Sequence, residues 1–597
     1  MWVGIGVGIG RNRFATGIFN AYALRVTADG GITEAGQCVD AVSGLLLNAS
    51  LLLIPSGYKG GKLYAEIPTN GNGDLTWTRG SDGFRTNASG LIQRVPWNLL
   101  QQSETFDNAI WSKTNTTIVA NAETAPNGTL TADTMTVPDS TTNLSQGVSY
   151  GSGEYTFSVY VKIISQTTGG VMRLQGFVDG ANVSMNFTPT TEWQLFTATF
   201  NATTSITSLR IRGQAFVGTL AIWGAQLVQG TTAQTYLPTT DRLNFPRLSY
   251  MYGSCPSVLL EPQRTNLALQ SETFDNASWT KLNSSITANT TTSPDGTTNA
   301  DSLIENTASG LHIIYQLLTT TATTYSLSCY IKPDTRTRAF LRSDTSSGTA
   351  RTLFDLTGAG SVVSLAHTSA SITLIGNGWY RCVITFTEGT GASGRLFAIE
   401  GAVGINVSYV GNGLNAFYLY GAQLEAGAYP TSYIPTTSSS ATRVADSFSR
   451  NNIYTNGLIT SSGGTWFVEL LNNVAYTRDG ISTGLFIDTD ASSYTNGINI
   501  RNGGGGSTRL VISKWVGGTG TPLFTTTTDT VKIAVKWNGT TADVFVNGTK
   551  QVSATSFTPT AMQFVKSEGN QVPVFISQMD LFPTPLSDTD CTTLTTL

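Results

Sequence analysis

Short stretches in which apolar and polar residues alternate, separated by turn residues, run along most of the chain. In one such stretch every second residue is apolar, namely Tyr155, Phe157, Val159 and Val161. Residues 465–470 and 531–537 show a similar alternation. A period of two is typical of half-buried β-strands. Asn547-Gly548 separates two further stretches, and such a dipeptide is a strong hairpin signal. No stretch keeps a helical period, so the pattern predicts an all-β protein.

One string of eight residues, QSETFDNA, occurs at 102–109 and again at 270–277. It lies inside a longer duplication, because residues 98–135 align without a gap on residues 266–303 with 22 of 38 positions identical. Further matches follow in the same order and pair 155–162 with 325–332, 193–200 with 379–386, 223–227 with 420–424 and 236–240 with 433–437. A whole domain is therefore repeated.

The offset between the two copies grows from 168 residues at the shared string to 197 at the closing YLPTT and YIPTT segments, so the second copy carries 29 extra residues (197 − 168). Insertions of this kind enter surface loops, because a loop costs little to lengthen. We interpret the shared string as the opening strand and turn of the domain, with the first strand beginning at Asn98, Leu99 and Leu100. The loops that differ between the copies are where we expect binding.

A chain of 597 residues is too long for one hydrophobic core. We predict an N-terminal module at 1–97, a first sandwich at 98–240, a connector at 241–265, a second sandwich at 266–437, a connector at 438–460 and a third sandwich at 461–597. The sandwiches should be antiparallel jelly rolls. The N-terminal module lacks the repeat strands, and we expect it to be small, extended and dependent on a partner.

The charge of the chain excludes two classes of partner. Charged residues make up 12% of the sequence and the formal net charge is −4, so a uniformly basic surface for nucleic acid or an anionic membrane is not expected. No apolar run reaches the roughly 18 residues that a membrane helix needs. The longest apolar run, 45–54, should form a buried pair of strands.

The cysteines and histidines give little support for catalysis or cross-linking. The five cysteines have no CxxC spacing, so neither a disulfide framework nor a zinc site is indicated; Cys329 and Cys382 could face each other, but buried free thiols are the simpler interpretation. His312 and His367 are the only histidines, and both lie in the second copy. A Ser-His-Asp centre would need one of them. We expect no enzyme, although two of the acidic residues could still form a glycosidase pair.

Two tryptophans, Trp111 and Trp279, follow the shared string at the same distance in each copy, shortly after Phe106 and Phe274. An aromatic face suits the C–H face of a pyranose, so both are candidates for carbohydrate binding. The identical spacing favours the alternative that they fill the core of each sandwich.

Four aspartates are candidate metal ligands. Asp133 and Asp301 follow the turns PNGT and PDGT, and Asp488 and Asp490 lie in the segment FIDTD. A calcium ion would need about six to eight oxygen ligands, and one shared acid per copy favours a role in stabilising a turn. We therefore expect no cofactor, with a structural calcium as the alternative.

The C-terminal pattern resembles the concanavalin A-like or laminin-G-like jelly roll, in which a late apolar strand, an Asn-Gly turn and a strand ending in V-N-G follow one another, as at 531–548. The two repeats resemble carbohydrate-binding-module-like domains in structural proteins of tailed bacteriophages, particularly those of Bacteroidetes hosts. The similarity includes PSGYK..KLY at 55–64, CPS.LLEPQRTNL at 255–267 and TRVAD at 442–446. The first repeat lacks the second of these phrases, so the first domain should sit differently against its N-terminal neighbour.

This resemblance implies a virion structural protein, such as a head fibre or tail fibre, on the surface of the particle. The N-terminal module would bind other virion proteins of the capsid or tail. The chain would form a homotrimer, or a pentamer at a capsid vertex, and would bind host-surface or mucus glycans through weak sites whose affinities combine. The alternatives are a purely architectural decoration or collar protein that binds no sugar, and a polysaccharide depolymerase.

Overall fold

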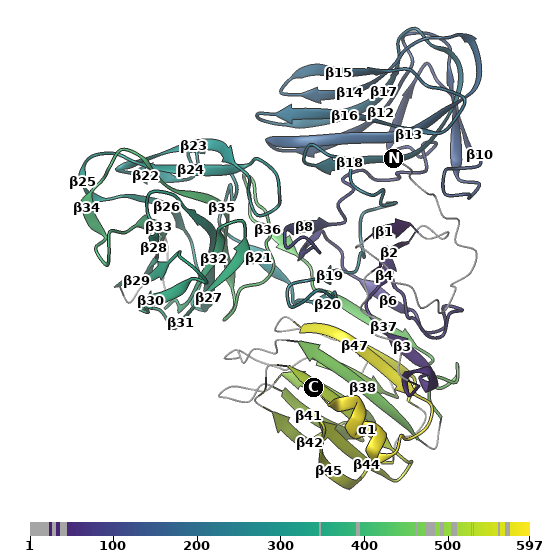
Figure 1. Ribbon diagram of the computed structural model, residues 1–597, viewed down its shortest axis with the longest axis vertical. Helices are drawn as coiled ribbons and strands as arrows, with labels where there is room; N and C mark the ends of the chain where they lie inside the picture. Colours follow the sequence, from purple (N-terminus) through teal and green to yellow (C-terminus); the bar gives the residue numbers. More distant parts are fainter. Residues whose placement is uncertain are drawn as a thin grey trace. The chain divides into compact units, whose positions relative to one another are not determined.

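The computed structural model describes residues 23–26, 31–35, 44–345, 348–389, 395–460, 463–471, 484–489, 495–502, 510–526, 528, 530–558, 562–567 and 574–596. Strands that form sandwiches make up most of this part of the chain (Figure 1), and the predicted all-β class is confirmed. Among these residues no helix is long and apolar enough to cross a membrane. Two compact units are present, one around the first sandwich and one containing the second and third sandwiches.

The first sandwich packs two five-stranded sheets over one core. Phe157, Val159 and Val161 are buried in this core, as the period of two predicts. One sheet has the order β10 (Ile118–Glu123), β11 (Ala132–Val137), β18 (Val217–Gln229), β13 (Gly153–Thr168) and β16 (Gln194–Ala202). The other has the order β15 (Ala181–Phe187), β14 (Met172–Val178), β17 (Ile206–Gly213), β12 (Asn143–Tyr150) and β9 (Trp111–Thr114).

The second sandwich repeats this strand order and adds one strand to each sheet. One sheet has the order β23 (Ser284–Thr291), β24 (Ala300–Glu305), β35 (Asn415–Ala426), β27 (Thr324–Pro333), β32 (Trp379–Thr387) and β31 (Ser369–Gly376). The other has the order β22 (Thr280–Leu282), β26 (Ile313–Leu318), β33 (Arg395–Gly401), β28 (Arg338–Thr345), β29 (Gly348–Asp355) and β30 (Ser361–Ser364). The shared order is the structural counterpart of the duplicated sequence.

The third sandwich also consists of two sheets. One contains β19 (Leu248–Ser249), β20 (Ser257–Leu260), β47 (Val574–Phe582), β38 (Gly464–Leu471), β43 (Val531–Trp537), β44 (Thr541–Val546) and β45 (Thr549–Ser556), with β3 (Leu51–Leu53) paired to β47. The other runs β4 (Gly57–Lys59), β5 (Lys62–Leu63), β6 (Leu75–Thr78), β37 (Ser447–Asn451), β46 (Phe564–Ser567), β39 (Gly484–Asp488), β40 (Gly497–Asn502), β41 (Leu510–Val516) and β42 (Thr519–Thr526).

Strands from the first hundred residues therefore complete the sheets of the third sandwich. Leu51 lies opposite Leu581, and Trp77 lies opposite Phe448. Two strands of the predicted N-terminal module, β3 and β6, are thus hydrogen-bonded to β47 and β37. The predicted pair of strands at 45–54 is wrong: the 3-10 helix η1 (Leu46–Asn48) precedes the single strand β3, because the N–H of Asn48 closes a turn onto the carbonyl of Leu45 at 3.1 Å.

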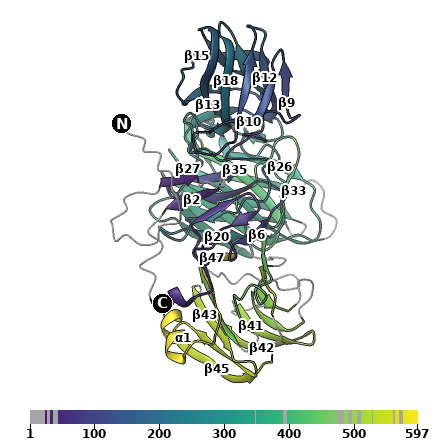
Figure 2. The same ribbon diagram turned by 90° about the vertical axis from the view of Figure 1, so that its right-hand side faces the viewer.

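The remaining elements are small. They are β1 (Ala23–Val26) with β2 (Ile32–Ala35), the hairpin of β7 (Gly83–Thr86) and β8 (Ile92–Val95), β21 (Arg264–Asn266) with β36 (Ala441–Arg443), β25 (Ser309–Leu311) with β34 (Ser408–Val410), and the helix α1 (Asp588–Thr595). The helix packs against β43, β44 and β45 (Figure 2). The helix is too short for its period to be detected in the sequence. Its N-terminus is stabilised by Ser587, whose Oγ accepts the N–H of Asp590 at 3.0 Å.

The shared string does not begin a strand. Residues 98–110 form turns and irregular backbone, and the first strand of this sandwich begins at Trp111, so the predicted strand at Asn98 is wrong. The side chain of Asn98 gives the reason: its Oδ1 accepts the N–H groups of Leu100 and Leu227, and its Nδ2 donates to two backbone carbonyls. These bonds fasten the loop to β18. Asn266 makes the equivalent bonds in the second copy.

Cys329 and Cys382 lie opposite each other on β27 and β32 and are buried free thiols. Burial raises the pKa of both thiols well above the ordinary value, so both groups are held as neutral thiols. Cys255 is disulfide-bonded, which the irregular cysteine spacing did not predict.

Candidate functional site

Trp111 and Trp279 are buried in their sandwich cores, with 1% and 4% of their surface exposed. Their ring centroids lie 5.0 Å and 4.9 Å from those of Phe106 and Phe274. Each indole N–H donates to a backbone carbonyl of the shared string, that of Gln102 or Gln270. Neither tryptophan offers a face to a sugar, so burial excludes the stacking alternative.

Asp133 and Asp301 fasten the shared string to the neighbouring turn. Asp301 accepts the N–H of Phe274 at 2.8 Å and the N–H of Asn289 at 2.9 Å, and Asp133 makes the same two bonds in the first copy. Burial raises the pKa of Asp301 to about 7, and the two N–H donors oppose this shift. Because both carboxylate oxygens are used by backbone donors, these residues stabilise turns.

Asp488 is hydrogen-bonded within its own loop. Asp488 is buried at the end of β39 and accepts the N–H groups of Thr489 at 2.6 Å and Asn496 at 3.1 Å, which fixes the loop after the strand. Asp490 lies outside the described residues. In the part of the chain that the structure describes, no three His, Cys, Asp or Glu side chains are grouped to hold a metal ion.

Neither histidine is hydrogen-bonded to an acidic side chain among the described residues. His367 is buried between the hydroxyls of Ser343 and Thr352, at 3.1 Å and 2.7 Å, and burial lowers its pKa to about 4. His312 stacks on Tyr409 with a centroid distance of 4.6 Å. Within the described residues neither imidazole hydrogen-bonds to a carboxylate, so they form no Ser-His-Asp centre.

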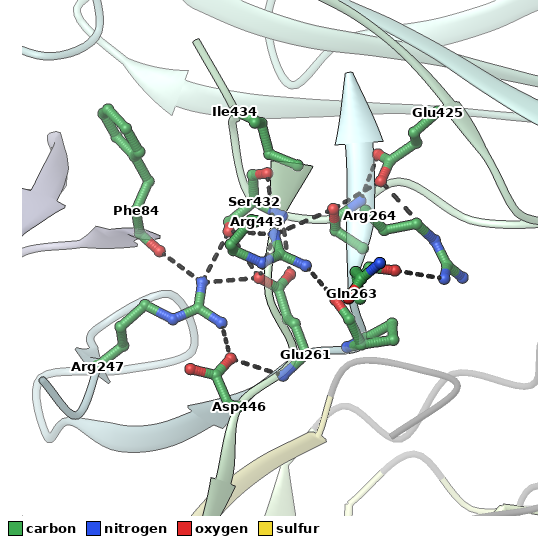
Figure 3. Close-up of polar contacts among 12 residues, drawn as sticks. Phe84, Arg247, Glu261, Gln263, Arg264, Glu425, Ser432, Ile434, Arg443 and Asp446 are labelled. Atoms are coloured by element: carbon green, nitrogen blue, oxygen red, sulfur yellow. Dashed lines mark hydrogen bonds and ion pairs between the residues drawn. The ribbon is translucent and has the colours of Figure 1, made fainter. Parts of the chain in front are cut away.

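Charged residues from segments outside the two repeated domains form a buried ion network (Figure 3). Arg247 Nη1 lies 2.7 Å from Glu261 Oε2, and its Nη2 bonds Asp446. Arg79 Nη1 lies 2.8 Å from Asp446 Oδ1, and Arg443 Nη1 lies 2.9 Å from Glu261 Oε2. All five side chains are at most 3% exposed. Three guanidinium groups and two carboxylates therefore share a site closed to solvent.

Backbone and hydroxyl groups complete this network. Arg247 donates to the carbonyl of Phe84 at 2.9 Å, and Ser432 donates its N–H and its hydroxyl to Glu261 at 2.7 Å and 2.6 Å. Buried charges persist only when they are paired and hydrogen-bonded in this way. The network gives a role to Arg79, to Glu261 of the phrase CPS.LLEPQRTNL and to Asp446 of TRVAD, which the sequence alone did not assign. Their side chains hold together segments that are far apart in the sequence.

Acid should weaken this network. Burial alone would raise the pKa of Glu261, but the guanidinium groups of Arg443 and Arg247 outweigh burial and lower it to about 2. Because this value lies below the roughly 4.3 of an unfolded chain, Glu261 stabilises the fold above about pH 4.3, and the stabilisation is lost as the pH falls toward about 2.

We expect Glu261→Gln to remove this part of the pH dependence, which urea unfolding of both chains at stepped acidic pH would measure. Glu192→Gln, at an exposed position, is the matched control and should keep the slope of the original chain. Equal slopes of unfolding free energy against pH for the Glu261→Gln chain and the original chain would contradict the prediction.

A cleft of about 440 Å³ opens beside the network. On β27 and β32, Cys329 and Cys382 face the core, so their neighbours Tyr330 and Arg381 point to the opposite side of the sheet and line the cleft. Residues from other segments close it, namely Phe84, Arg85, Ser249, Met251, Tyr252, Glu261, Ser432 and Phe575. Its volume lies within the range of about 300–1,000 Å³ that is typical of ligand sites.

The lining combines aromatic, hydroxyl and cationic groups. The guanidinium carbon of Arg381 lies 5.5 Å from the ring centroid of Tyr330, and Nη2 donates to the carbonyl of Thr431 at 2.6 Å. Ser369, Ser371 and Thr373 are exposed and occupy alternate positions of β31, so their hydroxyls form a row on one face. A ligand in the cleft would meet an apolar ring surface beside a line of hydrogen-bonding groups.

The sequence shows that the second copy has extra residues but does not show that they add a strand. β31 lies at the end of its sheet and has no counterpart in the first sandwich, whose sheet ends at β16. The hydroxyl row therefore belongs to an added strand and not to a loop. Only the alternation of Ser369, Ser371 and Thr373 with Ala370 and Ile372 could have indicated it.

The chain matches no family model. Nor does any curated protein match it. Among solved structures, it is similar to the CBM22-1-CBM22-2 tandem domain from Paenibacillus barcinonensis Xyn10C, at 11% identity and a TM-score of 0.20, over 55% of this chain and 97% of that chain. It is similar to a Trypanosoma rangeli sialidase in complex with sialic acid, at 8% identity and a TM-score of 0.19, over 87% of this chain and 97% of that chain. It is also similar to a glycoside hydrolase family 32 protein from Bifidobacterium adolescentis, at 9% identity and a TM-score of 0.13, over 74% of this chain and 99% of that chain. TM-scores of this size carry no weight for function, which therefore rests on the chain's own residues.

Proposed function

We propose that this protein binds saccharides and that the cleft on the second sandwich is a binding site. The observation that carries the proposal is the row of exposed hydroxyls on β31 beside the ring of Tyr330 and the guanidinium of Arg381. A sugar ring has apolar C–H faces and polar hydroxyl edges, so it matches a lining of this composition. The buried ion network next to the cleft holds the lining in place before the ligand arrives.

Binding without hydrolysis fits the acidic groups of the cleft. Glu261 is the one carboxylate among the described lining residues, and it is bonded to Arg247, Arg443 and Ser432. A glycosidase needs two carboxylates about 5 to 10 Å apart, one of which must carry a proton. A carboxylate whose pKa lies at about 2 is a poor proton donor at neutral pH. Incubation with a polysaccharide that binds, followed by analysis for released oligosaccharides, tests this point.

Filling the cleft should weaken saccharide binding. Ser371→Trp places a bulky side chain on the exposed face of β31, and we expect it to weaken binding of the best ligand on a glycan array by about tenfold or more, equal to about 1.4 kcal/mol. Ser361→Trp, on the exposed strand β30 of the opposite sheet, is the matched control and should bind normally. Unchanged binding by the Ser371→Trp chain would exclude the cleft. No binding by the original chain would favour an architectural role.

The proposed setting is the surface of a tailed-bacteriophage particle, as a head fibre, tail fibre or similar appendage. The support is the resemblance of PSGYK..KLY, CPS.LLEPQRTNL and TRVAD to phrases of such virion proteins. In this setting the N-terminal residues attach the chain to the capsid or tail, and a homotrimer increases the apparent affinity of weak glycan sites. Labelling purified particles with an antibody to this chain tests the location, and light scattering of the purified chain tests the oligomer.

A further inference from the structure

The outer face of the sheet β15-β14-β17-β12-β9 in the first sandwich carries an ordered array of polar side chains. Leu174 and Ile211 are buried in the core, so the alternate residues of β14 and β17 point outward. The strand register places Arg173 opposite Arg212 and Gln175 opposite Arg210. On β15, Asn186 lies opposite Arg173 and Ser184 lies opposite Gln175. On β12, Asn143 lies opposite Arg212 and Ser145 lies opposite Arg210.

No residue of the five strands compensates the positive charge of this face. The five strands contain no aspartate or glutamate. Arg210 and Arg212 donate to the same oxygen, Gln175 Oε1, at 3.1 Å and 3.3 Å, and Arg212 Nε is buried without a hydrogen-bond partner among the described residues. Like charges directly opposite each other destabilise a sheet. An anion placed between Arg173 and Arg212 would remove this repulsion.

The second sandwich shows that the fold does not require such a cluster. In the second sandwich the residue equivalent to Arg212 is Glu400. Both occupy the same position in the strand register, and both are followed by a glycine. Glu400 lies 2.9 Å from Arg342 and 2.7 Å from Arg351, which face each other on β28 and β29. Asp344 adds a further ion pair to Arg342 at 2.7 Å. The second copy therefore neutralises its own arginines, whereas the first copy leaves its charge open to a ligand.

The neighbours of the arginines indicate which anion fits. Asn182, Ser184 and Asn186 on β15 are exposed amide and hydroxyl groups, and the guanidinium of Arg210 lies 5.7 Å from the ring centroid of Phe177. We propose that this face binds an acidic saccharide, whose carboxylate or sulfate lies between Arg173 and Arg212 while its hydroxyls bond the amide and hydroxyl groups of β15. The site is separate from the cleft on the second sandwich and does not depend on it.

The test uses the full chain with an oligogalacturonate, the same oligomer after reduction of its carboxyl groups, and a sulfated oligosaccharide of similar length. The acidic oligomers should bind and the reduced one should bind about tenfold more weakly or worse, because hydrogen bonds to a charged group are stronger than those to a neutral group. Arg212→Glu supplies the carboxylate that Glu400 provides in the second copy. This change should reduce binding by about tenfold or more and leave the melting temperature unchanged or higher, because Arg173 then faces an opposite charge.

Two control variants and one substitute variant complete the test. Arg338→Gln removes an arginine already paired with Asp355 at 3.0 Å in the second sandwich and should leave binding unchanged, as should Ser371→Trp in the cleft. If Arg212→Glu does not fold, the double change Arg173→Gln and Arg210→Gln should give a similar loss, because Arg212 is then the one arginine left of the three. Failure of both acidic oligomers to bind, or full binding by a folded Arg212→Glu chain, would overturn the proposal. Equal binding of a single-stranded oligonucleotide would show a general polyanion surface instead.

Discussion

Asp446→Ala should lower the free energy of unfolding by about 3–5 kcal/mol, because it leaves two buried guanidinium groups without their shared carboxylate. Asp446 contacts Arg79 through Oδ1 and Arg247 through Oδ2, and Oδ2 also accepts the N–H of Glu261 at 3.0 Å. The backbone N–H of Asp446 in turn donates to the carbonyl of Glu261 at 2.9 Å. Guanidinium-induced unfolding monitored by tryptophan fluorescence would measure the loss.

The comparison chain for this experiment is Asp275→Asn, at an exposed position of the shared string in the same unit. It should change the unfolding free energy little, since surface substitutions away from special features have small effects. Hydrogen exchange would add a local measurement, in which the Asp446→Ala chain loses protection at β20, β36 and β37 before the centre of the second sandwich. An unfolding curve that coincides with that of the Asp275→Asn chain would show that the network does not stabilise the fold.

Trp279→Ala should cost the second sandwich about 3–5 kcal/mol through loss of buried surface and the cavity that remains. The side chain is 4% exposed, packs on Phe274 and donates its N–H to the carbonyl of Gln270. The same change at Trp111 should destabilise the first sandwich by a similar amount, because the environment is repeated. Calorimetry of both chains would resolve the two effects.

The tryptophan experiment also separates packing from sugar stacking. At a temperature where the Trp279→Ala chain stays folded, it should bind saccharides as the original chain does, because no surface that a ligand can reach has changed. Trp279→Phe, which keeps an aromatic side chain in the core, should destabilise less than Trp279→Ala. A loss of binding without a loss of stability would restore the stacking role that burial excludes.

The two copies of the repeated domain differ in ways that suit different ligands. The second sandwich has the extra strand β31 with its hydroxyl row and carries Glu400 against its own arginines. The first sandwich has neither, and its arginine face is open. Duplication followed by divergence would give one chain two binding surfaces of different charge, and this is what the two proposals above predict.

The sequence by itself determined the all-β class, the duplication and many of the strands. Residues 465–470 and 531–537 were predicted as strands and lie in β38 and β43, because alternation along a short segment is a local property that the backbone expresses directly. The repeat is visible in the sequence because equivalent positions of the two copies keep the same residue where it makes the same contacts. Asn98 and Asn266, which make equivalent hydrogen bonds, are an example.

Only the tertiary structure decided what the polar residues do. Arg79, Glu261 and Asp446 are far apart in the sequence and look like ordinary surface charges, yet they are buried together. Arg173 and Arg212 become neighbours through the register of β14 and β17. The strand at Asn98 was wrong because side-chain hydrogen bonds outweighed the local pattern. The physical reason is the same in each case: alternation is encoded between adjacent residues, whereas charge pairing depends on which distant strands the fold brings together.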